Sequence, residues 1–455
     1  ADSRVLQGVT TEVTGNCGGS AAPIDGPRAE ERRANLSRDL ERPVSWSSVD
    51  SYLKALQANG LSINHALLLG QGTLRSNAIG LVDRRLTDDE LKGVLRAVEQ
   101  GLDEGAFGLS TGLEYTPGRY TPTEEITAMA RIVARAGGIY TSHIRNEEAR
   151  LLESVNEAIS IGRQAGVRVE VSHLKAAGRP NWAMQTAAID LIESARRQGV
   201  EVLADAYPYT AYSTGLSIFV SDWALDGGWP ALSARLKNDA DRARIRTEML
   251  DRIRNEPGDY ELIVISSVDS EADREFVGQN VAGIAKTWRV EPVDAILRLL
   301  EQNEGDVGYI GHAMSPENVA LVLRHPLVMI GSDGYSMAPE GPAAKTRPHP
   351  RSYGTFPRVL GYYTREQHLF DLPTAVRKMT SMPADQAGLR DRGRIARGKK
   401  ADLVLFDANT IRDQATFDDP HRYPAGIPFV IVNGRLVVDE GRHTGAKPGQ
   451  VLRRG

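Results

Sequence analysis

Seven short apolar segments, separated by longer amphipathic ones, constrain the fold of this chain most strongly. The short segments are rich in Val, Ile, Leu, Ala and Thr, and most lack strict alternation of apolar and polar residues. That pattern is typical of strands buried on both faces of a parallel sheet. We expect strands at residues 11–18, 62–70, 106–113, 138–144, 167–174, 200–208 and 326–334.

The segments between these strands have the spacing of amphipathic helices. Residues 121–137 and 147–166 place apolar side chains at helical intervals, and each ends at a glycine, a common helix terminator. Alternation of strands and helices predicts βα units. The 455 residues suffice for an α/β fold of the TIM type, a (β/α)8 barrel of roughly 250 to 400 residues, with an appendage.

Two regions depart from this alternation. Residues 222–300 contain charged helical segments and one strand-like run, ELIVISSV, and are interpreted as an insertion between the last two barrel strands. After residue 390 short β runs are split by turn residues, and VNGRLVVDEG predicts a hairpin with Asn-Gly at its turn. We therefore expect a barrel over residues 1–390, with an insertion at about 222–300. Residues 391–455 would form the C-terminal part of a small β-sandwich domain.

Composition excludes several classes of protein. Hydrophobic residues make up 41% and charged residues 25%, which indicates a folded globular chain. The net charge of −4 without blocks of like charge predicts neither a nucleic-acid nor a membrane partner. No apolar run approaches the roughly 20 residues of a membrane-spanning helix. The single cysteine cannot form an internal disulfide, so we expect a cytoplasmic protein.

Reactive side chains stand at the ends of five predicted strands: Cys17, His143, His173, Tyr207 and Asp333. Taken singly, each has a structural explanation, since a lone histidine is usually a hydrogen-bonded core residue and an aspartate often sits in a turn. Catalytic groups of a (β/α)8 barrel, however, lie at the carboxyl ends of its strands. The shared position therefore favours an active site.

Cys17, His143 and His173 are suitable donors for Zn²⁺. Thiolate and imidazole match the softness of zinc, and three protein ligands leave a position open for water or substrate. Zinc lowers the pKa of bound water to about 7 and polarises a carbonyl. Asp333 could then serve as general base toward that water and as acid toward a leaving amine.

Eight motifs distributed along almost the whole chain carry a family resemblance. They are GVTTEVTGNCG (8–18), GLSTGLEYTPG (108–118), SHIRNE (142–147), VSHLK (171–175), DAYPYTA (205–211), IGSDG (330–334), HPRSYGTFPRVLG (349–361) and GRIARGKKADLVLFD (393–407). With these motifs the chain resembles the D-aminoacylases, or N-acyl-D-amino-acid deacylases, of the amidohydrolase superfamily. The resemblance implies a barrel with a β-sandwich, and hydrolysis of N-acyl-D-amino acids to a D-amino acid and a carboxylate.

The resemblance also implies roles for individual residues. The cysteine and two histidines that bind the tight zinc fall on Cys17, His143 and His173, and the catalytic aspartate falls on Asp333. Tyr207 matches a tyrosine that aids the substrate carbonyl.

Arg351 and Lys175 match basic residues near the pocket, and we expect both to bind substrate. A guanidinium fork suits a carboxylate, so Arg351 is the expected partner of the substrate α-carboxylate, although it could be an ordinary loop arginine. The role of Glu114 stays open.

One departure from the family pattern concerns the first strand. Members carry a His-x-His pair there, whereas this sequence has no histidine before His65 and no His-x-His. Seven strands leave two unpaired edges where a closed barrel needs an eighth. We expect an N-terminal segment that precedes this chain; the alternative is a fold that closes in another way. We also expect one tightly bound zinc, or at most a weak second.

Two other functions remain open at this point. The chain could be a related amidohydrolase that acts on a cyclic imide or a dipeptide. It could also be a non-catalytic barrel that serves as a scaffold or binding protein.

Overall fold

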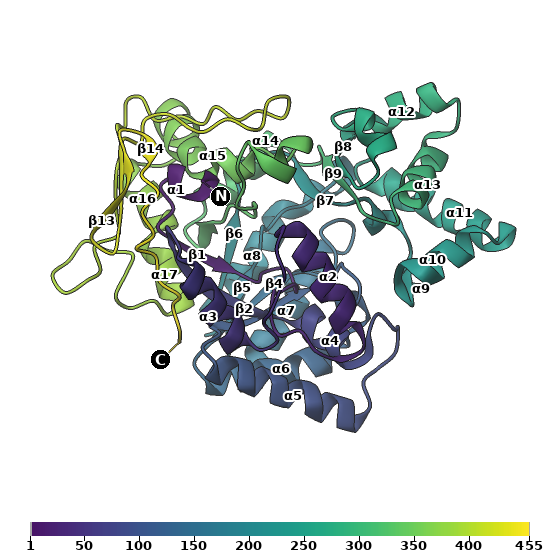
Figure 1. The fold of residues 1–455 in the computed structure, drawn as a ribbon, viewed down its shortest axis with the longest axis horizontal. Coiled ribbons are helices and arrows are strands. Elements are labelled where there is room, and N and C mark those ends of the chain that lie inside the picture. Colours follow the sequence, from purple (N-terminus) through teal and green to yellow (C-terminus); the bar gives the residue numbers. More distant parts are fainter. Residues whose placement is uncertain (1, 455) are drawn as a thin grey trace.

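A seven-stranded parallel sheet forms the centre of the molecule (Figure 1). The structure is a computed structural model, and it describes residues 2–454. The strand order β1-β2-β3-β4-β5-β6-β10 confirms a curled sheet of the barrel type. Each of the seven predicted segments contains one strand. The strands are β1 (Thr11–Thr14), β2 (Asn64–Gly70), β3 (Gly108–Gly112), β4 (Ile139–His143), β5 (Arg168–Val171), β6 (Val202–Ala206) and β10 (Val328–Ile330).

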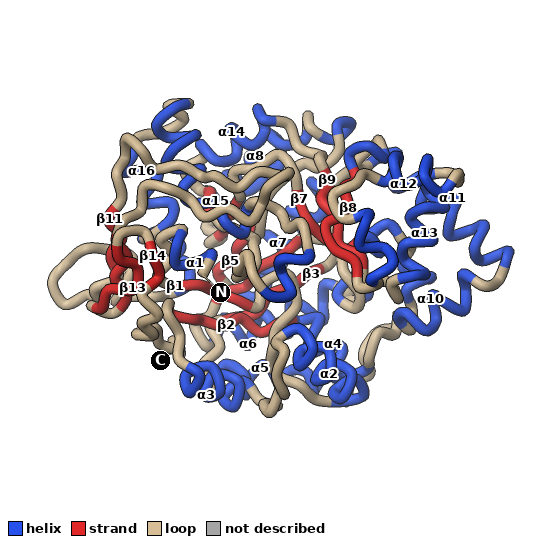
Figure 2. The backbone as a smooth tube through the Cα atoms, turned by 45° about the horizontal axis from the view of Figure 1, so that its top comes forward, coloured by secondary structure: helices blue, strands red, loops and turns tan. Residues whose placement is uncertain are grey.

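Helices surround this sheet on its outer side (Figure 2). Both predicted helices are present, and α7 ends at Gly166, whose φ of 69° lies in the left-handed region that favours glycine. No helix of residues 2–454 is long and apolar enough to cross a membrane. The helices are α2 (Ala29–Asp39), α3 (Val49–Asn59), α4 (Gln71–Ile79), α5 (Asp88–Asp103), α6 (Thr123–Arg135), α7 (Leu151–Ala165), α8 (Met184–Arg197), α14 (Pro316–Arg324), α15 (Arg351–Arg358), α16 (Leu372–Met379) and α17 (Ser381–Ala387).

The sheet is an incomplete barrel, because β1 and β10 each pair on one side only within the described residues. The short helix α1 (Ser3–Leu6) joins the β1 side to the loop that follows β10. Ser3 N donates to Met337 O at 3.0 Å, and Gln7 Nε2 donates to Ser352 O at 2.8 Å. These contacts hold the segment before β1 close to the segment after β10.

The chain between β6 and β10 forms a separate antiparallel sheet in the order β7-β9-β8, packed with helices (Figure 1). This segment includes residues 222–300, the expected insertion, but its first and last strands lie wholly outside that range. Its elements are β7 (Tyr212–Gly215), α9 (Asp222–Leu225), α10 (Gly228–Leu236), α11 (Asp239–Asn255), β8 (Ile263–Val268), α12 (Val281–Trp288), α13 (Pro292–Gln302) and β9 (Val307–Gly311).

The last part of the chain forms a four-stranded antiparallel sheet. Asn433 and Gly434 connect β12 to β13 with φ values of 49° and 78°, which confirms the predicted hairpin turn. A β-sandwich needs two packed sheets, and among the described residues this part of the chain forms one sheet. The strands are β11 (Leu403–Leu405), β12 (Phe429–Val432), β13 (Arg435–Asp439) and β14 (Arg442–His443).

Candidate metal centre

Three predicted site residues turn the backbone sharply where a strand has just ended. Cys17, His173 and Asp333 have φ values of 52°, 40° and 46°, and they follow β1, β5 and β10. Non-glycine residues rarely adopt this left-handed region, and those that do cluster at functional sites. Because parallel strands end at the same edge of the sheet, these turns bring the three residues to one cavity of about 1200 Å³.

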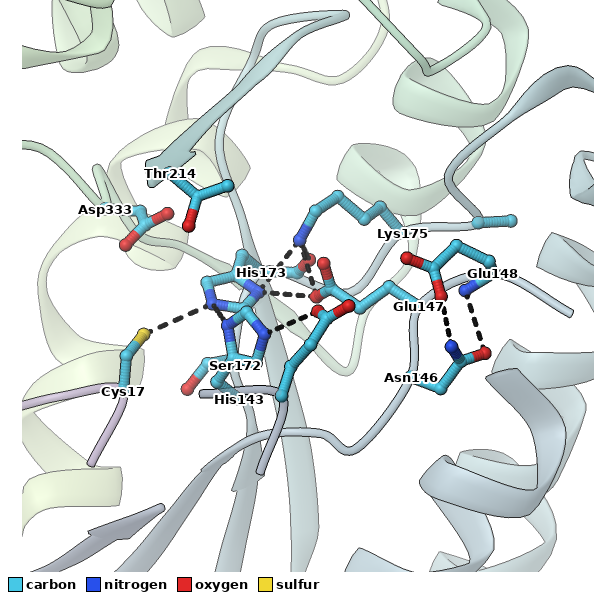
Figure 3. Close-up of polar contacts among 12 residues, drawn as sticks. Cys17, His143, Asn146, Glu147, Glu148, Ser172, His173, Lys175, Thr214 and Asp333 are labelled. Atoms are coloured by element: carbon cyan, nitrogen blue, oxygen red, sulfur yellow. Dashed lines mark hydrogen bonds and ion pairs between the residues drawn. The ribbon is translucent and has the colours of Figure 1, made fainter. Parts of the chain in front are cut away.

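Cys17, His143 and His173 point their donor atoms toward one another (Figure 3). Cys17 Sγ lies 3.3 Å from His173 Nε2, and His143 Nδ1 lies 3.0 Å from the same nitrogen. Two nitrogens on a tetrahedral zinc, each at about 2.0–2.1 Å, are about 3.3 Å apart. The observed spacings are within a few tenths of an ångström of zinc geometry, so the donor set fits this metal.

A carboxylate faces the outer nitrogen of each histidine. Glu114 Oε2 lies 3.1 Å from His143 Nε2, and Glu147 Oε1 lies 2.9 Å from His173 Nδ1. A carboxylate at one ring nitrogen holds a proton there and leaves the lone pair of the other nitrogen free. His143 would therefore offer Nδ1 to a metal, and His173 would offer Nε2.

The electrostatics of the cluster favour a thiolate. Burial raises the pKa of the Cys17 thiol, but the charge of His173 and hydrogen bonds from His143 and His173 outweigh it, so the pKa lies below its ordinary value. Thiolate is the form of cysteine that binds metals.

Asp333 lies apart from the three donors and faces Arg351 instead. Its Oδ2 is 2.7 Å from Arg351 Nη1. Burial raises the pKa of Asp333, but the charges of Arg351, His173 and Lys175 outweigh this and keep it below its ordinary value. The carboxylate is therefore ionised at neutral pH, as a general base must be.

Tyr207 lies against the two predicted basic residues. Its ring centroid is 4.8 Å from Arg351 Cζ and 5.7 Å from Lys175 Nζ. The Tyr207 hydroxyl is buried and has no hydrogen-bond partner among the described residues. A buried polar group without a partner costs stability, so such a group in a native protein calls for an explanation, for example a catalytic role.

Lys175 is engaged with its own chain. Its ammonium donates to Glu147 Oε1 at 2.5 Å and lies 3.0 Å from His173 Nδ1. Glu147 and Tyr207 raise the pKa of Lys175 despite burial, which lowers it. Lys175 therefore supports His173 through Glu147 and also lines the cavity.

Several residues of the site carried no separate prediction. Glu147 closes the SHIRNE motif, and Tyr115 lies in GLSTGLEYTPG, so position within a motif was the available signal for both. The Tyr115 ring centroid lies 4.5 Å from that of His143. Arg252 of α11 contacts Glu114 from the inserted segment, and nothing in its local sequence pointed to the site.

The chain is similar to several known proteins. Residues 64–438 match the profile of the amidohydrolase family. N-acyl-D-glutamate deacylase from Alcaligenes xylosoxydans xylosoxydans is 36% identical over 451 residues, which cover 99% of this chain and 81% of that protein.

Solved structures show the same similarity. N-acyl-D-glutamate deacylase from Bordetella bronchiseptica, complexed with zinc and a phosphonate inhibitor that mimics the tetrahedral intermediate, has a TM-score of 0.82 at 34% identity, covering 99% of this chain and 84% of that chain. A structure of D-aminoacylase has a TM-score of 0.80 at 33% identity, covering 99% of this chain and 84% of that chain. It was described in a study of the binuclear metal centre of that enzyme, with one-metal activation and second-metal attenuation.

Proposed function

Because this chain belongs to the D-aminoacylase family of amidohydrolases, we propose that it hydrolyses the amide bond of N-acyl-D-amino acids and releases a D-amino acid and a carboxylate. The observation that carries the proposal is the convergence of Cys17, His143 and His173 in a cavity that Asp333 also lines.

Cys17, His143 and His173 would hold one zinc ion tightly. When bound, zinc polarises the scissile carbonyl and lowers the pKa of water. Support for a single tight ion comes from the cations that already neutralise the neighbouring acids: Arg252 contacts Glu114, and Lys175 contacts Glu147.

Asp333 would act as the general base and then as the general acid. Its carboxylate takes a proton from the attacking water and later gives that proton to the leaving nitrogen of the D-amino acid. The low pKa that Arg351 imposes keeps Asp333 ready to accept a proton at neutral pH.

Tyr207 and Arg351 would bind the substrate. The unpartnered Tyr207 hydroxyl can donate to the substrate carbonyl oxygen as negative charge develops there. Arg351 is buried and contacts Ser213 O at 3.2 Å through Nη2, which fixes the guanidinium beside the cavity for the α-carboxylate. Lys175 would add positive charge on the same side.

Metal content and a substrate panel test the proposal together. The purified protein should contain zinc and hydrolyse N-acetyl-D-amino acids in preference to their L-enantiomers. Cys17→Ala should lose both tight zinc and turnover, because the metal then lacks one of three protein ligands. An active variant without zinc, or activity confined to L-forms or to cyclic imides, would refute the proposal.

A further inference from the structure

We propose that Arg252, an arginine of the inserted helix α11, is a positioning residue of the metal centre. Through Glu114 it would hold His143 in the orientation and tautomer that present Nδ1 to the metal. The inference rests on the zinc site proposed above and adds a residue from outside the barrel to its support.

A continuous set of contacts leads from α11 to the metal donors. Arg252 Nη2 contacts Glu114 Oε1, while the other oxygen of that carboxylate, Oε2, lies 3.1 Å from His143 Nε2. His143 Nδ1 lies 3.0 Å from His173 Nε2. Glu114 thus divides its two oxygens between the guanidinium and the imidazole, so the position of one partner affects the other.

Burial makes this arrangement depend on Arg252. Glu114 and Glu148 have side chains 4% and 7% exposed, and Glu148 Oε1 lies 3.8 Å from Arg252 Nη2. A buried carboxylate is unfavourable unless it is paired. Arg252 is the cation that contacts both acids, since Lys175 is directed to Glu147. Without Arg252, the buried Glu114 carboxylate would lose its guanidinium partner, and it would shift away from its place at His143 Nε2.

A second cation is the competing explanation for these acids. Glu114, His143 and Glu147 lie close enough together to hold an ion, and so do Glu114, Glu148 and Glu256. In the structure, however, the carboxylates of Glu114 and Glu147 already contact Arg252 and Lys175. The geometry therefore assigns the acids to internal ion pairs, and metal stoichiometry can distinguish the two explanations.

Helix α11 supplies a matched control. Arg246, on the same helix, pairs with Asp294 at 3.1 Å, and both side chains are about a third exposed. Arg246→Gln removes an arginine–carboxylate contact of α11 without touching Glu114 or the metal donors. Effects that both variants share would come from a disturbed inserted segment rather than from the metal centre.

The experiment measures zinc affinity by chelator competition, and the visible spectrum of the cobalt-substituted protein, for the wild type, Arg252→Gln, Arg252→Lys and Arg246→Gln. Loss of a residue that orients a metal ligand typically lowers affinity about 10- to 100-fold, and we expect about tenfold for Arg252→Gln. The visible absorption bands of the cobalt-substituted Arg252→Gln protein should also shift, because the geometry of the ligands around the metal changes. Arg252→Lys should recover part of the affinity, and it serves as the test if Arg252→Gln does not fold. Arg246→Gln should resemble the wild type.

The outcomes separate the inference from the function on which it rests. Wild-type protein that binds no zinc would defeat the proposed function itself. Wild type that binds zinc, with Arg252→Gln matching Arg246→Gln in affinity and in cobalt spectrum, would overturn the role of Arg252 alone. A second zinc gained by Arg252→Gln, with unchanged affinity for the first, would also overturn it and would favour the competing explanation.

Discussion

Arg351 Nη1 lies 2.7 Å from Asp333 Oδ2, so the residue assigned to the substrate carboxylate is ion-paired with the residue assigned as general base. Both side chains face the same cavity. One guanidinium can serve two carboxylates because its five N–H donors form a planar fork. With the roles proposed above, substrate binding and proton transfer would be coupled through Arg351.

Arg351→Met should move the acid limb of the pH profile of kcat/KM to higher pH. Burial raises the pKa of Asp333, and Arg351 is the first of the charges that lower it. Without that charge the pKa rises, so protonation inactivates the base at a higher pH on acidification. Steady-state kinetics between about pH 4 and pH 9 measure this. Arg351→Lys keeps a positive charge and should shift the acid limb less than Arg351→Met does. An acid limb that does not move in Arg351→Met would show that Arg351 does not set the pKa of the general base.

Asp333→Asn should retain zinc and lose turnover. Asp333 is not among the three converging metal donors, and removal of a general base costs about 10²- to 10⁴-fold in rate. Zinc analysis and kcat on one preparation test both parts. Asp306→Asn is a matched control, because Asp306 lines the same cavity with a side chain 73% exposed. Normal turnover by Asp333→Asn would place the general base elsewhere.

Much of the fold followed from local pattern. Buried parallel strands are continuous apolar runs, and β2, β3 and β4 are buried at every residue, so their positions were predictable. The first and last residues of the strands were less predictable. For example, β10 spans Val328–Ile330, whereas the predicted strand spans residues 326–334. Strand length depends on which backbone groups find partners on the neighbouring strand, and among the described residues β10 pairs only with β6.

The site was predictable only where it depends on strand ends. Cys17, His143 and His173 each lie at or just after a strand, and the parallel sheet brings them together. The contact between Arg252 and Glu114 joins residues 138 positions apart, and it depends on how the inserted segment packs against the barrel. Sequence spacing within one strand or helix does not contain that information.

Glu147→Gln should weaken zinc binding about 10- to 100-fold. Glu147 Oε1 accepts from Lys175 Nζ and lies 2.9 Å from His173 Nδ1. The glutamine side chain of this variant has no charge. It would therefore orient His173 less strongly than the carboxylate does, and it would leave the buried Lys175 without its counter-ion. Chelator competition measures the affinity. Glu153→Gln, on the exposed face of α7, is the control. Equal zinc affinity in Glu147→Gln and the wild type would limit Glu147 to pairing with Lys175.

N-acyl-D-amino acids with uncharged side chains should be better substrates than those of D-glutamate or D-aspartate. Three cations line the cavity, and each already pairs with an acid: Arg4 with Glu12, Lys175 with Glu147, and Arg351 with Asp333. Acidic side chains outnumber these cations there: Glu12, Glu114, Glu147, Glu170, Asp205, Glu256, Asp306 and Asp333.

The α-carboxylate of every substrate can share Arg351 with Asp333, but a second carboxylate finds no free cation among the described residues that line the cavity. An unpaired carboxylate in a site lined by acids is unfavourable. We expect kcat/KM for N-acetyl-D-leucine or N-acetyl-D-methionine to exceed that for N-acetyl-D-glutamate by about tenfold or more, since about 1.4 kcal/mol of unfavourable interaction suffices for that ratio. Competition between the two substrates in one assay measures the ratio directly. A preference for the glutamate derivative would mean that Lys175 leaves Glu147 to bind the substrate side chain, and Lys175→Met should then abolish that preference.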